Sequence, residues 1–543
     1  MAESIIQIKS LPGIKRDGTR FEGDQYVDGQ WVRFQRGLPR KMGGYRSINK
    51  FLSGIARTLH GYTQDALTYI HAGSPSILER FYIDRNLNTS VIYNRTPSTL
   101  IASDQNLWQF DVDTASSLTG IQLVAQVAPN LGCICNSVGG QLFVGDLFGT
   151  ASLTELTVAN GNLPSQVSLT GGVVALHPYT VIFGTDGYVG WSVPGDPTDF
   201  VGSGAGYAYV TGQKIVRGMP LRGGPGNSPS GLLWSADSII RMSYIGGTPT
   251  FQFDTISAQS SIMSAQSVIE YDGVFFWVGV DRFLMFNGVV REVENNLNQN
   301  FFFDNLNTAQ RQKVFAMKVP RFGEIWWCFP KGDSEEPNHA IVYNVRENTW
   351  YDTALPNGGR GAGLFPTVFS KPLMSGVAPN LLSTTYRITQ DGDMRVTEDD
   401  KYRITEESGE ARYKFWMHEQ GVDEIDGLNL QPIQSYFETA DISLPVQSQQ
   451  NRAIQVLIME PDFVQTGPIT VEVRGRANAR GPEVDSEPRV IVETPQTPQE
   501  QIIYFKDQRR EMRFRFESNC LGGDYQMGQI LAHVQPGDST VVG

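Results

Sequence analysis

Residues 267–293, SVIEYDGVFFWVGVDRFLMFNGVVREV, contain short apolar runs separated by two tight turns. Asp272-Gly273 and Asn287-Gly288 are typical of two-residue hairpin turns, because glycine accepts the positive φ that such turns require. In the run between them, both sets of alternating positions are apolar from Val274 to Gly279. Successive side chains of a strand point to opposite faces, so we expect both faces of this strand to be buried.

The same style of segment recurs between residues 51 and 385. Apolar strand cores begin at residues 67, 141, 181, 232, 274 and 324, and after the first gap they start 40, 51, 42 and 50 residues apart. A period of about 40–50 residues, with several strands per unit and apolar residues on both faces, is typical of β-propeller blades. We therefore predict a propeller of five to seven blades over residues 51–385. Two stacked sandwiches are the alternative, since they also have short strands and frequent turns.

The composition agrees with a mainly β chain. At 543 residues the chain is too long for one core, so two to four domains are expected. It has 56 glycines and only 19% charged residues, which favours short strands joined by tight turns over helices. Helical periodicity is scarce, and the best candidate for a helix is the short stretch 305–318.

The C-terminal residues 433–543 show about six strands with clean alternation. In MRFRFES, we expect Met512, Phe514 and Phe516 to point inward and Arg513, Arg515 and Glu517 to point outward. Residues 433–543 are therefore predicted to form a β-sandwich or small barrel.

Residues 1–50 form a basic leading segment in an acidic chain. They hold ten Lys or Arg against five Asp or Glu, whereas the whole chain has a net charge of −13. Such asymmetry suggests docking on an acidic surface or nucleic acid; a solvated arm without a partner is the alternative. Trp31 and Phe34 are expected to anchor the segment on its own body or on a neighbour by burying their rings.

Three similar octads follow one another at residues 386–409: YRITQDGD, MRVTEDDK and YRITEESG. Each has a four-residue strand pattern and a polar turn, which would align Arg387, Arg395 and Arg403 on one face. Asp391 and Asp393 are interpreted as turn residues, because the spaced ligand set of a calcium loop is missing. Strands this short are marginal alone, so the octads are expected to pack on the rest of the chain or to pair with another subunit. Residues 386–432 are predicted to be an octad-repeat hairpin insertion and a linker.

No catalytic signature is present in the sequence. It lacks a GxxxxGK[ST] phosphate loop, an HExxH motif and a GxSxG elbow, and its six histidines include no i, i+4 pair. The Gly-rich stretches VGSGAGYAY and LRGGPGNSPSG are interpreted as loops, and Cys133 and Cys135 as buried thiols. We expect no enzyme activity, no cofactor and no metal. We also expect no signal peptide and no membrane span, and folding in a reducing cytoplasm.

Two stretches resemble a known family. Residues 10–48, SLPGIKRDGTRFEGDQYVDGQWVRFQRGLPRKMGGYRSI, are similar to the opening of tail proteins of short-tailed bacteriophages. The C-terminal YFETADISL, MEPDF and RREMRFRFESNCLGGDYQMGQI resemble the closing sandwich of the same proteins, and the octads resemble repeats of phage tail proteins. Together these stretches resemble the tail nozzle family, also called tail hub or packaged-DNA stabilisation proteins.

The resemblance implies a propeller-containing subunit of a hexameric ring below the portal and its adaptor ring. Such a ring extends the channel for double-stranded DNA without sequence-specific contact, retains the packaged genome and carries fibres or spikes. It would be assembled in the bacterial cytoplasm and reside in the virion tail. The basic segment would dock on the adaptor through its cations, which are Arg16, Arg33, Arg36, Arg40 and Lys41.

The octads would then form a subunit interface or channel gate that includes Tyr386, Arg387, Asp391, Asp393, Arg395 and Arg403. Intact, DNA-retaining rings after deletion of residues 386–409 would contradict that hypothesis. An acidic body suits a conduit, because a wall that repels phosphate lets DNA slide.

Two other functions remain open. A propeller-based tail adhesin or polysaccharide depolymerase would need an aromatic cluster with paired carboxylates in one pocket. A bacterial interaction scaffold would need neither. Native mass distinguishes a six-fold nozzle from a trimeric adhesin and from a monomeric scaffold.

Overall fold

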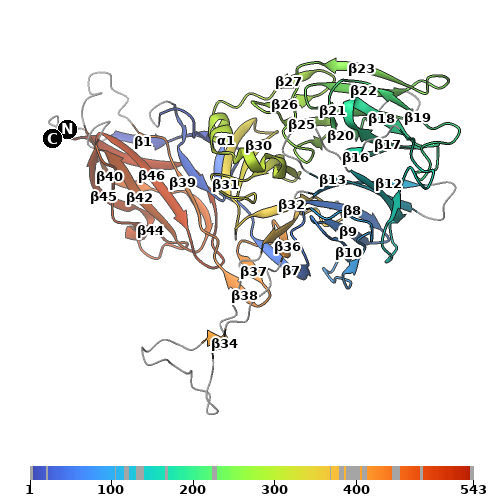
Figure 1. Cartoon of the computed structure of the whole chain (residues 1–543). Helices are drawn as coiled ribbons and strands as arrows, with labels where there is room; N and C mark the ends of the chain where they lie inside the picture. The colour runs from blue at the N-terminus through green and yellow to red at the C-terminus, as the bar shows by residue number, and fades with distance from the viewer. Residues whose placement is uncertain are drawn as a thin grey trace, which may run out of the picture.

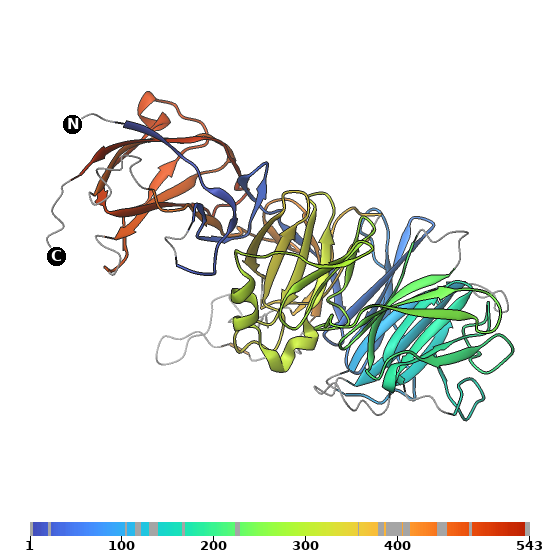
Figure 2. The same ribbon diagram turned by 90° about the horizontal axis from the view of Figure 1, so that it is seen from above.

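The computed structural model describes most of the chain: residues 4–19, 23–103, 106–114, 121–129, 140–165, 169–222, 229–356, 358–366, 368–377, 385–386, 404–405, 413–442, 453–476 and 481–537. With 54% strand and 4% helix, the chain is mainly β, as the sequence predicts. Figure 2 shows an elongated molecule with the C-terminal strands at one end and a series of small sheets at the other.

Among the described residues, six antiparallel sheets each consist of four strands that follow one another in the chain. The first three contain β8 (Thr58–Gln64), β9 (Leu67–Gly73), β10 (Leu78–Ile83) and β11 (Tyr93–Asn94); β12 (Asn106–Thr114), β13 (Ile121–Pro129), β14 (Gln141–Asp146) and β15 (Thr154–Leu156); and β16 (Leu169–Leu176), β17 (Tyr179–Gly184), β18 (Tyr188–Trp191) and β19 (Gly206–Tyr209).

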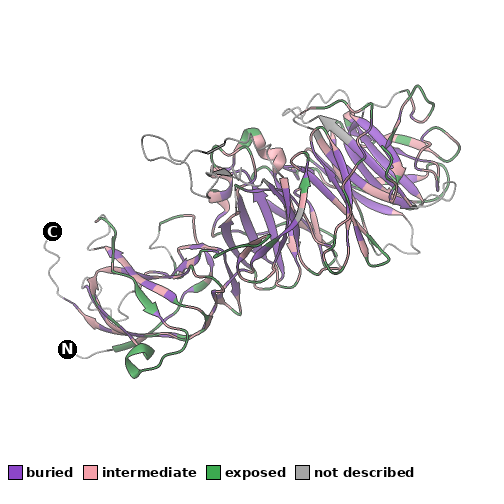
Figure 3. Ribbon diagram, turned by 90° about the horizontal axis from the view of Figure 1, so that it is seen from below, coloured by how far each residue is buried: buried purple, intermediate pink, exposed green. Residues whose placement is uncertain are grey.

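The next three contain β20 (Ile215–Pro220), β21 (Ser230–Ser235), β22 (Ile239–Tyr244) and β23 (Phe251–Ser257); β24 (Ile269–Tyr271), β25 (Val274–Val278), β26 (Phe283–Phe286) and β27 (Val290–Glu292); and β28 (Phe315–Val319), β29 (Glu324–Phe329), β30 (His339–Asn344) and β31 (Thr349–Ala354). In Figure 3 the strands of these sheets are mostly buried.

Each predicted strand core lies in an inner strand of one of these sheets: β9, β14, β17, β21, β25 and β29. The predicted hairpin turn between β24 and β25 is confirmed, because Asp272 and Gly273 have φ values of 50° and 80°. Trp277 in β25 is fully buried and Phe276 is 3% exposed, so both faces of that strand are covered as expected.

A further, six-stranded sheet combines distant parts of the chain in the order β32, β33, β36, β7, β37, β38. Its strands are β32 (Arg360–Leu364), β33 (Leu373–Val377), β36 (Tyr413–His418), β7 (Tyr45–Leu52), β37 (Glu424–Asp426) and β38 (Asn429–Gln431). Its first strand, β32, lies beside β28 on one side and β8 on the other. The first strands of the first four sheets are also neighbours in space: β8 lies beside β12, β12 beside β16, and β16 beside β20. The first strands of the fifth and sixth sheets, β24 and β28, lie beside each other as well.

The helix predicted at residues 305–318 is found in part, as a 3₁₀ helix over Thr308–Lys313, and is wrong from Phe315 onward, where a strand begins. The α-helix α1 (Gln299–Asn305) ends where the prediction begins, and a 3₁₀ turn (Thr308–Lys313) leads directly into β28. The side chain of Asn307 accepts a hydrogen bond from the backbone N–H of Ala309 and so starts the 3₁₀ turn. Pairing of β28 with β29 then imposes an alternating burial pattern that a helix would not give.

The C-terminal region is built from three sheets that share strands with the first fifty residues: β1-β48-β40-β45, then β4-β39-β46-β42-β43 with β44 also on β42, and β41-β47-β6-β5 (Figure 1). The N-terminal strands are β1 (Ser4–Ile8), β4 (Asp28–Gln30), β5 (Val32–Gln35) and β6 (Leu38–Lys41), and a separate pair joins β2 (Leu11–Ile14) to β3 (Gln25–Tyr26). The C-terminal strands are β39 (Ser435–Glu438), β40 (Ile454–Glu460), β41 (Phe463–Thr466), β42 (Ile469–Arg476), β43 (Val484–Asp485), β44 (Arg489–Ile491), β45 (Ile503–Arg509), β46 (Glu511–Ser518), β47 (Asp524–Met527) and β48 (Ile530–Pro536).

The N-terminal segment packs on the chain's own body. Trp31 is 3% exposed and lies edge-on to Trp326 of β29, and Phe34 is 1% exposed and contacts Tyr351 of β31. One continuous apolar core therefore runs from the C-terminal sheets through these two rings into the sixth sheet. The predicted anchoring role of Trp31 and Phe34 is confirmed.

The alternation in β46 is confirmed on its inner face, where Met512, Phe514 and Phe516 are fully buried. Its outer face differs from the prediction, because Arg513 is only 2% exposed. The Arg513 Nε atom donates to Glu438 Oε2 at 3.0 Å, and its guanidinium also pairs with Glu483. Carboxylates from neighbouring segments cover this arginine, and MRFRFES alone does not contain them.

The core position Phe516 provides a stability test of the C-terminal sheets. Its ring stacks on Phe437 at 5.1 Å and lies 5.5 Å from Phe463, so Phe516→Ala leaves a cavity. We expect a loss of about 3–5 kcal/mol in the free energy of unfolding, measured by denaturant titration. Val464, which is 77% exposed in the same region, is the control: Val464→Ala should change stability by less than about 0.5 kcal/mol. Equal effects of the two substitutions would contradict this core.

Candidate functional site

Arg33 lies at a junction of three parts of the chain. It extends from β5 and is 1% exposed. Its Nη1 and Nη2 atoms donate to the two carboxylate oxygens of Glu419, after β36, at 2.8 and 2.5 Å. Nη2 also donates to Oε2 of Glu324, in β29, at 3.2 Å. The Arg33 Nε atom lies 2.8 Å from Glu324 Oε1, which is an ion pair but not an aligned hydrogen bond. The guanidinium carbon lies 3.7 Å from the ring centroid of Phe322.

Glu324 is the fully buried anion of this junction. Its carboxylate also accepts hydrogen bonds from Trp326 Nε1 at 2.9 Å and from the Tyr351 hydroxyl at 2.7 Å. Burial raises the pKa of Glu324 above its ordinary value, although Arg33 acts in the opposite direction. Burial alone would lower the pKa of Arg33, but Glu324 and Glu419 raise it overall, so Arg33 stays charged.

Arg16 makes a second ionic contact between the N-terminal segment and the sixth sheet. Its Nε atom donates to Asp352 Oδ1 of β31 at 2.8 Å, and Nη1 donates to Asp28 Oδ1 at 2.5 Å. His339 Nε2 lies 2.9 Å from Asp352 Oδ2. Burial would raise the pKa of Asp352, but Arg16 and His339 hold it well below its ordinary value.

Lys41 connects the same segment to the C-terminal region. It is 2% exposed, and its Nζ atom donates to the backbone carbonyl of Gly523 at 2.7 Å. Burial lowers the pKa of Lys41. Of the five cations predicted to dock a partner, Arg16, Arg33 and Lys41 thus lie in contacts within the chain.

Arg36 and Arg40 lie at the surface with two arginines from other turns. We call the four residues Arg36, Arg40, Arg321 and Arg346 the turn arginine patch. Arg36 is exposed at the β5–β6 turn, Arg321 at the β28–β29 turn and Arg346 at the β30–β31 turn, and Arg40 is half-buried.

Several contacts hold the turns of the turn arginine patch together. Arg346 Nη1 donates to the backbone carbonyl of Arg321 at 3.0 Å. The guanidinium carbons of Arg321 and Arg40 lie 5.3 and 6.0 Å from the centroid of Phe322. Glu347 accepts hydrogen bonds from the backbone N–H groups of Arg36 and Gly37 at 2.9 and 3.1 Å, which joins the β5–β6 turn to the β30–β31 turn. Three guanidiniums on adjacent turns, with that of Arg40 in β6 beside them, suit an acidic protein surface or phosphates.

Only Arg36 and Arg40 of the patch are predicted from the sequence as contacts for a partner. Arg321 and Arg346 stand in PRFG and VRENT, about 300 residues from the basic segment. The sequence pattern places both arginines in polar turns between aromatic strands. Their proximity to Arg36, however, follows only from the packing of β5 and β6 on the sixth sheet. Glu324 carried a clearer signal, since it is a charged residue at the start of the apolar run EIWWCF.

The octads are described at two points. Tyr386 lies in β34 (Thr385–Tyr386), which pairs antiparallel with β35 (Ile404–Thr405), so that Tyr386 faces Ile404. The other predicted octad residues, namely Arg387, Asp391, Asp393, Arg395 and Arg403, lie outside the described residues, as do Cys133 and Cys135. The octad interface or gate therefore stays a prediction.

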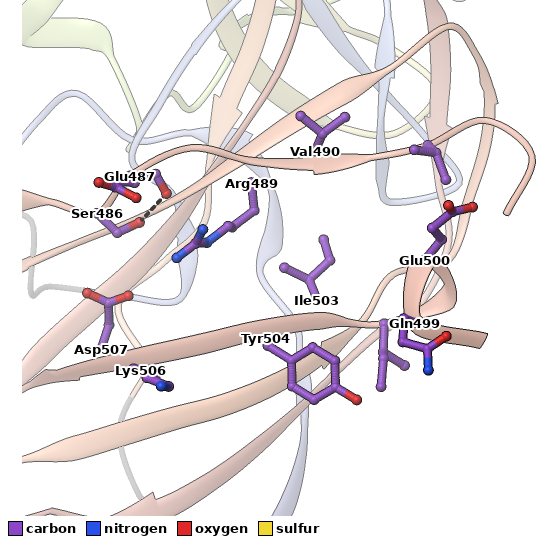
Figure 4. A pocket seen from close by; sticks show the side chains of 12 residues that line it. Ser486, Glu487, Arg489, Val490, Gln499, Glu500, Ile503, Tyr504, Lys506 and Asp507 are labelled. Carbon is purple, nitrogen blue, oxygen red and sulfur yellow. Dashed lines mark hydrogen bonds between the residues drawn. The ribbon is translucent and has the colours of Figure 1, made fainter. Parts of the chain in front are cut away.

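A groove of about 680 Å³ opens between β44 and β45 (Figure 4). Val490 and Tyr504 are 54% and 55% exposed there, and the carboxylates of Glu487 and Glu500 lie toward opposite ends. A smaller pocket of about 290 Å³ is lined by Lys15, Arg16, Asp17 and Phe301, among others. Across the described residues, no three His, Cys, Asp or Glu side chains form a group that could hold a metal ion. No helix in that part of the chain is long and apolar enough to cross a membrane.

Comparison with known proteins gives no family. No protein family profile matches the chain, and no curated protein is significantly similar in sequence. Among solved structures, the chain is similar to the computationally designed Ika8 protein, with a TM-score of 0.35 and 11% identity over 61% of this chain and 96% of that one. It is also similar to a chain of a nidogen/laminin complex, with a TM-score of 0.29 and 9% identity over 54% of this chain and 95% of that one. With TM-scores this low, neither similarity supports a conclusion.

The buried ion pairs of Arg33 should be required for the stability of the fold. Arg33→Met keeps most of the side-chain volume but leaves Glu324 buried without its cation, so we expect a loss of about 3–5 kcal/mol in the free energy of unfolding. The matched control is Arg36→Met on the adjacent turn, which should change stability by less than about 0.5 kcal/mol. Chemical denaturation measures both, and a loss for Arg33→Met no larger than that of the control would show that the junction is not required.

The Arg16–Asp352 contact makes a prediction about pH. Because the folded-state pKa of Asp352 is depressed, its contribution to stability is present above the unfolded-state pKa and is lost as the pH falls. Between about pH 4 and 2, the free energy of unfolding should therefore fall more steeply for the wild type than for Asp352→Asn. Urea titrations at several pH values measure this difference, and parallel curves would contradict the assignment.

Proposed function

We propose that the six four-stranded sheets from β8 to β31 and the six-stranded sheet that contains β7 are the seven blades of a β-propeller. Six blades are continuous in sequence, and their first strands are neighbours in space along most of the series. The series returns to its start because β32 lies beside β8. The seventh blade would be completed by β7 and β36, which are separated by about 360 residues, so that the N-terminal segment closes the ring.

We propose further that the chain is a structural subunit of a tail nozzle of the short-tailed phage type. The observation that carries this proposal is the position of residues 10–48, the stretch that resembles nozzle proteins. These residues form β2 to β6 and the start of β7, and so connect the C-terminal sheets with the proposed propeller. A subunit that must transmit force between an adaptor above and fibres below needs such a connection.

The charges support a conduit. The chain has a net charge of −13, and Arg16, Arg33 and Lys41 are engaged inside it, so the cations of the basic segment are only partly at the surface. An acidic wall weakens DNA binding and lets double-stranded DNA pass without sequence-specific contact. In this role the protein is not an enzyme, and six copies form the ring.

The turn arginine patch is the proposed contact with the adaptor protein. It presents guanidiniums from three adjacent turns, which suits carboxylates on a partner. The octads, including Tyr386, are the proposed contact between subunits or the channel gate, and fibres or spikes attach elsewhere. A ring with these contacts would assemble in the bacterial cytoplasm and reside in the virion tail.

Native mass spectrometry of the chain mixed with its adaptor tests this proposal. We expect a six-fold assembly and a reduction in adaptor affinity of roughly tenfold or more for Arg36→Glu/Arg321→Glu/Arg346→Glu, with stronger binding at low salt for the wild type. The control is Arg85→Glu/Arg241→Glu/Arg291→Glu, which reverses three exposed arginines elsewhere: one in the turn after β10, one in β22 and one in β27. A chain that stays monomeric with its adaptor would refute the nozzle role. If the two triple variants lose adaptor affinity equally, the proposed adaptor contact of the turn arginine patch is refuted, but the nozzle role is not.

A further inference from the structure

The stretch VGSGAGYAY, interpreted from sequence as a loop, ends in the strand β19. This strand is the outer edge of the third sheet and lies at the end of the molecule farthest from β1 and β48 (Figures 1 and 2). Tyr207 and Tyr209 are two residues apart and therefore lie on the same face of β19. They are 45% and 57% exposed, which is unusual for two neighbouring aromatic residues.

A third tyrosine fixes the geometry of this pair. Tyr188 of β18 is 2% exposed, and its ring stacks on Tyr207 with a centroid distance of 5.5 Å and an interplanar angle of 22°. Tyr209 is perpendicular to Tyr207, at 84° and 6.1 Å. The three rings, which we call the tyrosine platform, thus present two flat surfaces at a right angle.

Glycine makes room for this arrangement. Gly190 pairs with Tyr207 across the two strands, and a Cβ atom at Gly190 would lie 2.8 Å from the Tyr188 hydroxyl. Any side chain at Gly190 would therefore displace Tyr188 from its position beside Tyr207. The small residues of VGSGAG leave the rings accessible from solvent, so the platform is both rigid and open.

The strand that carries Tyr207 and Tyr209 is uncharged, as are the residues on either side of it. Residues 200–213 contain no charged side chain, although the chain as a whole is acidic. The outer strands of three other sheets each carry a charge, as expected for protected edges: β15, β23 and β27. The Asp199 carboxylate accepts the N–H groups of Val201 and Gly202, both at 2.8 Å. The carboxylate closest in sequence to Tyr188 is that of Asp186, which is exposed in the turn before β18.

We infer that the tyrosine platform is a binding site for a neutral saccharide. A sugar ring has an apolar C–H face that can lie on an aromatic ring, and hydroxyl groups that exchange hydrogen bonds with tyrosine hydroxyls. Nucleic acid would need cations beside the rings, and residues 200–213 contain none. A neutral ligand with one apolar face and polar edges matches the platform best.

This site adds a function to the proposed ring and does not depend on it. A saccharide contact at the end remote from the C-terminal strands would bring the particle against a polysaccharide surface. Because both tyrosines are largely exposed, replacing them should leave folding unchanged. Binding and assembly can therefore be measured separately on the same variants.

Saturation-transfer NMR and calorimetric titration of the full chain with maltohexaose, cellohexaose and chitohexaose test the inference. We expect at least one of these neutral hexasaccharides to bind, and Tyr207→Ala/Tyr209→Ala to weaken that binding by about tenfold or more. Tyr207→Phe/Tyr209→Phe should retain most of the binding, since it keeps the stacking surfaces. The control is Tyr504→Ala, which removes an equally exposed tyrosine from the groove of Figure 4 and should have no effect.

Three results would overturn the inference. The first is that none of the three hexasaccharides binds. The second is that Tyr504→Ala weakens binding as much as the platform variant. The third is that Tyr207→Ala/Tyr209→Ala changes the oligomeric state, measured as native mass, while sugar binding stays the same. In that case β19 would be a strand-pairing contact between copies of the chain.

Discussion

The ion pair of Arg33 with Glu324 and Glu419 is the constraint on which the arrangement of the two halves depends. Removing charges from water is costly, so such a pair adds little net stability compared with a well-packed apolar contact. Its effect is on specificity: any other position of β5 would leave Glu324 buried without a cation. The ion pair therefore favours the observed packing of the N-terminal segment on the sixth sheet over packings that separate Arg33 from Glu324.

That packing has consequences on both sides of the segment. Trp31 and Phe34, which flank the ion pair, join the apolar core of the C-terminal sheets to that of the sixth sheet. Lys41 is held against Gly523, and β7 continues from the segment into the middle of the seventh sheet. The leading fifty residues thus work as an internal connector. The same packing brings Arg36 and Arg40 beside two turns from the middle of the chain.

Local patterns predicted the secondary structure well where short-range physics decides it. Asp272-Gly273 forms a turn because its two residues accept positive φ, and Phe514 is buried because alternation in a strand puts it on the inner face. Predictions failed where a distant partner decides. Arg513 is covered by Glu438 and Glu483, and residues 315–318 form a strand because β29 supplies its hydrogen bonds.

By itself, the sequence determined that the chain is mainly β, that its strands recur in units of about 40–50 residues, and that its leading segment is anchored by two aromatic rings. These properties depend on the period of side chains along a strand and on the φ that glycine permits, which act over a few residues. Only the tertiary structure decided which cations face solvent, which turns gather four arginines, and which tyrosines remain uncovered. Burial, ion pairing and ring stacking join residues hundreds of positions apart, and a linear pattern contains no information on those distances.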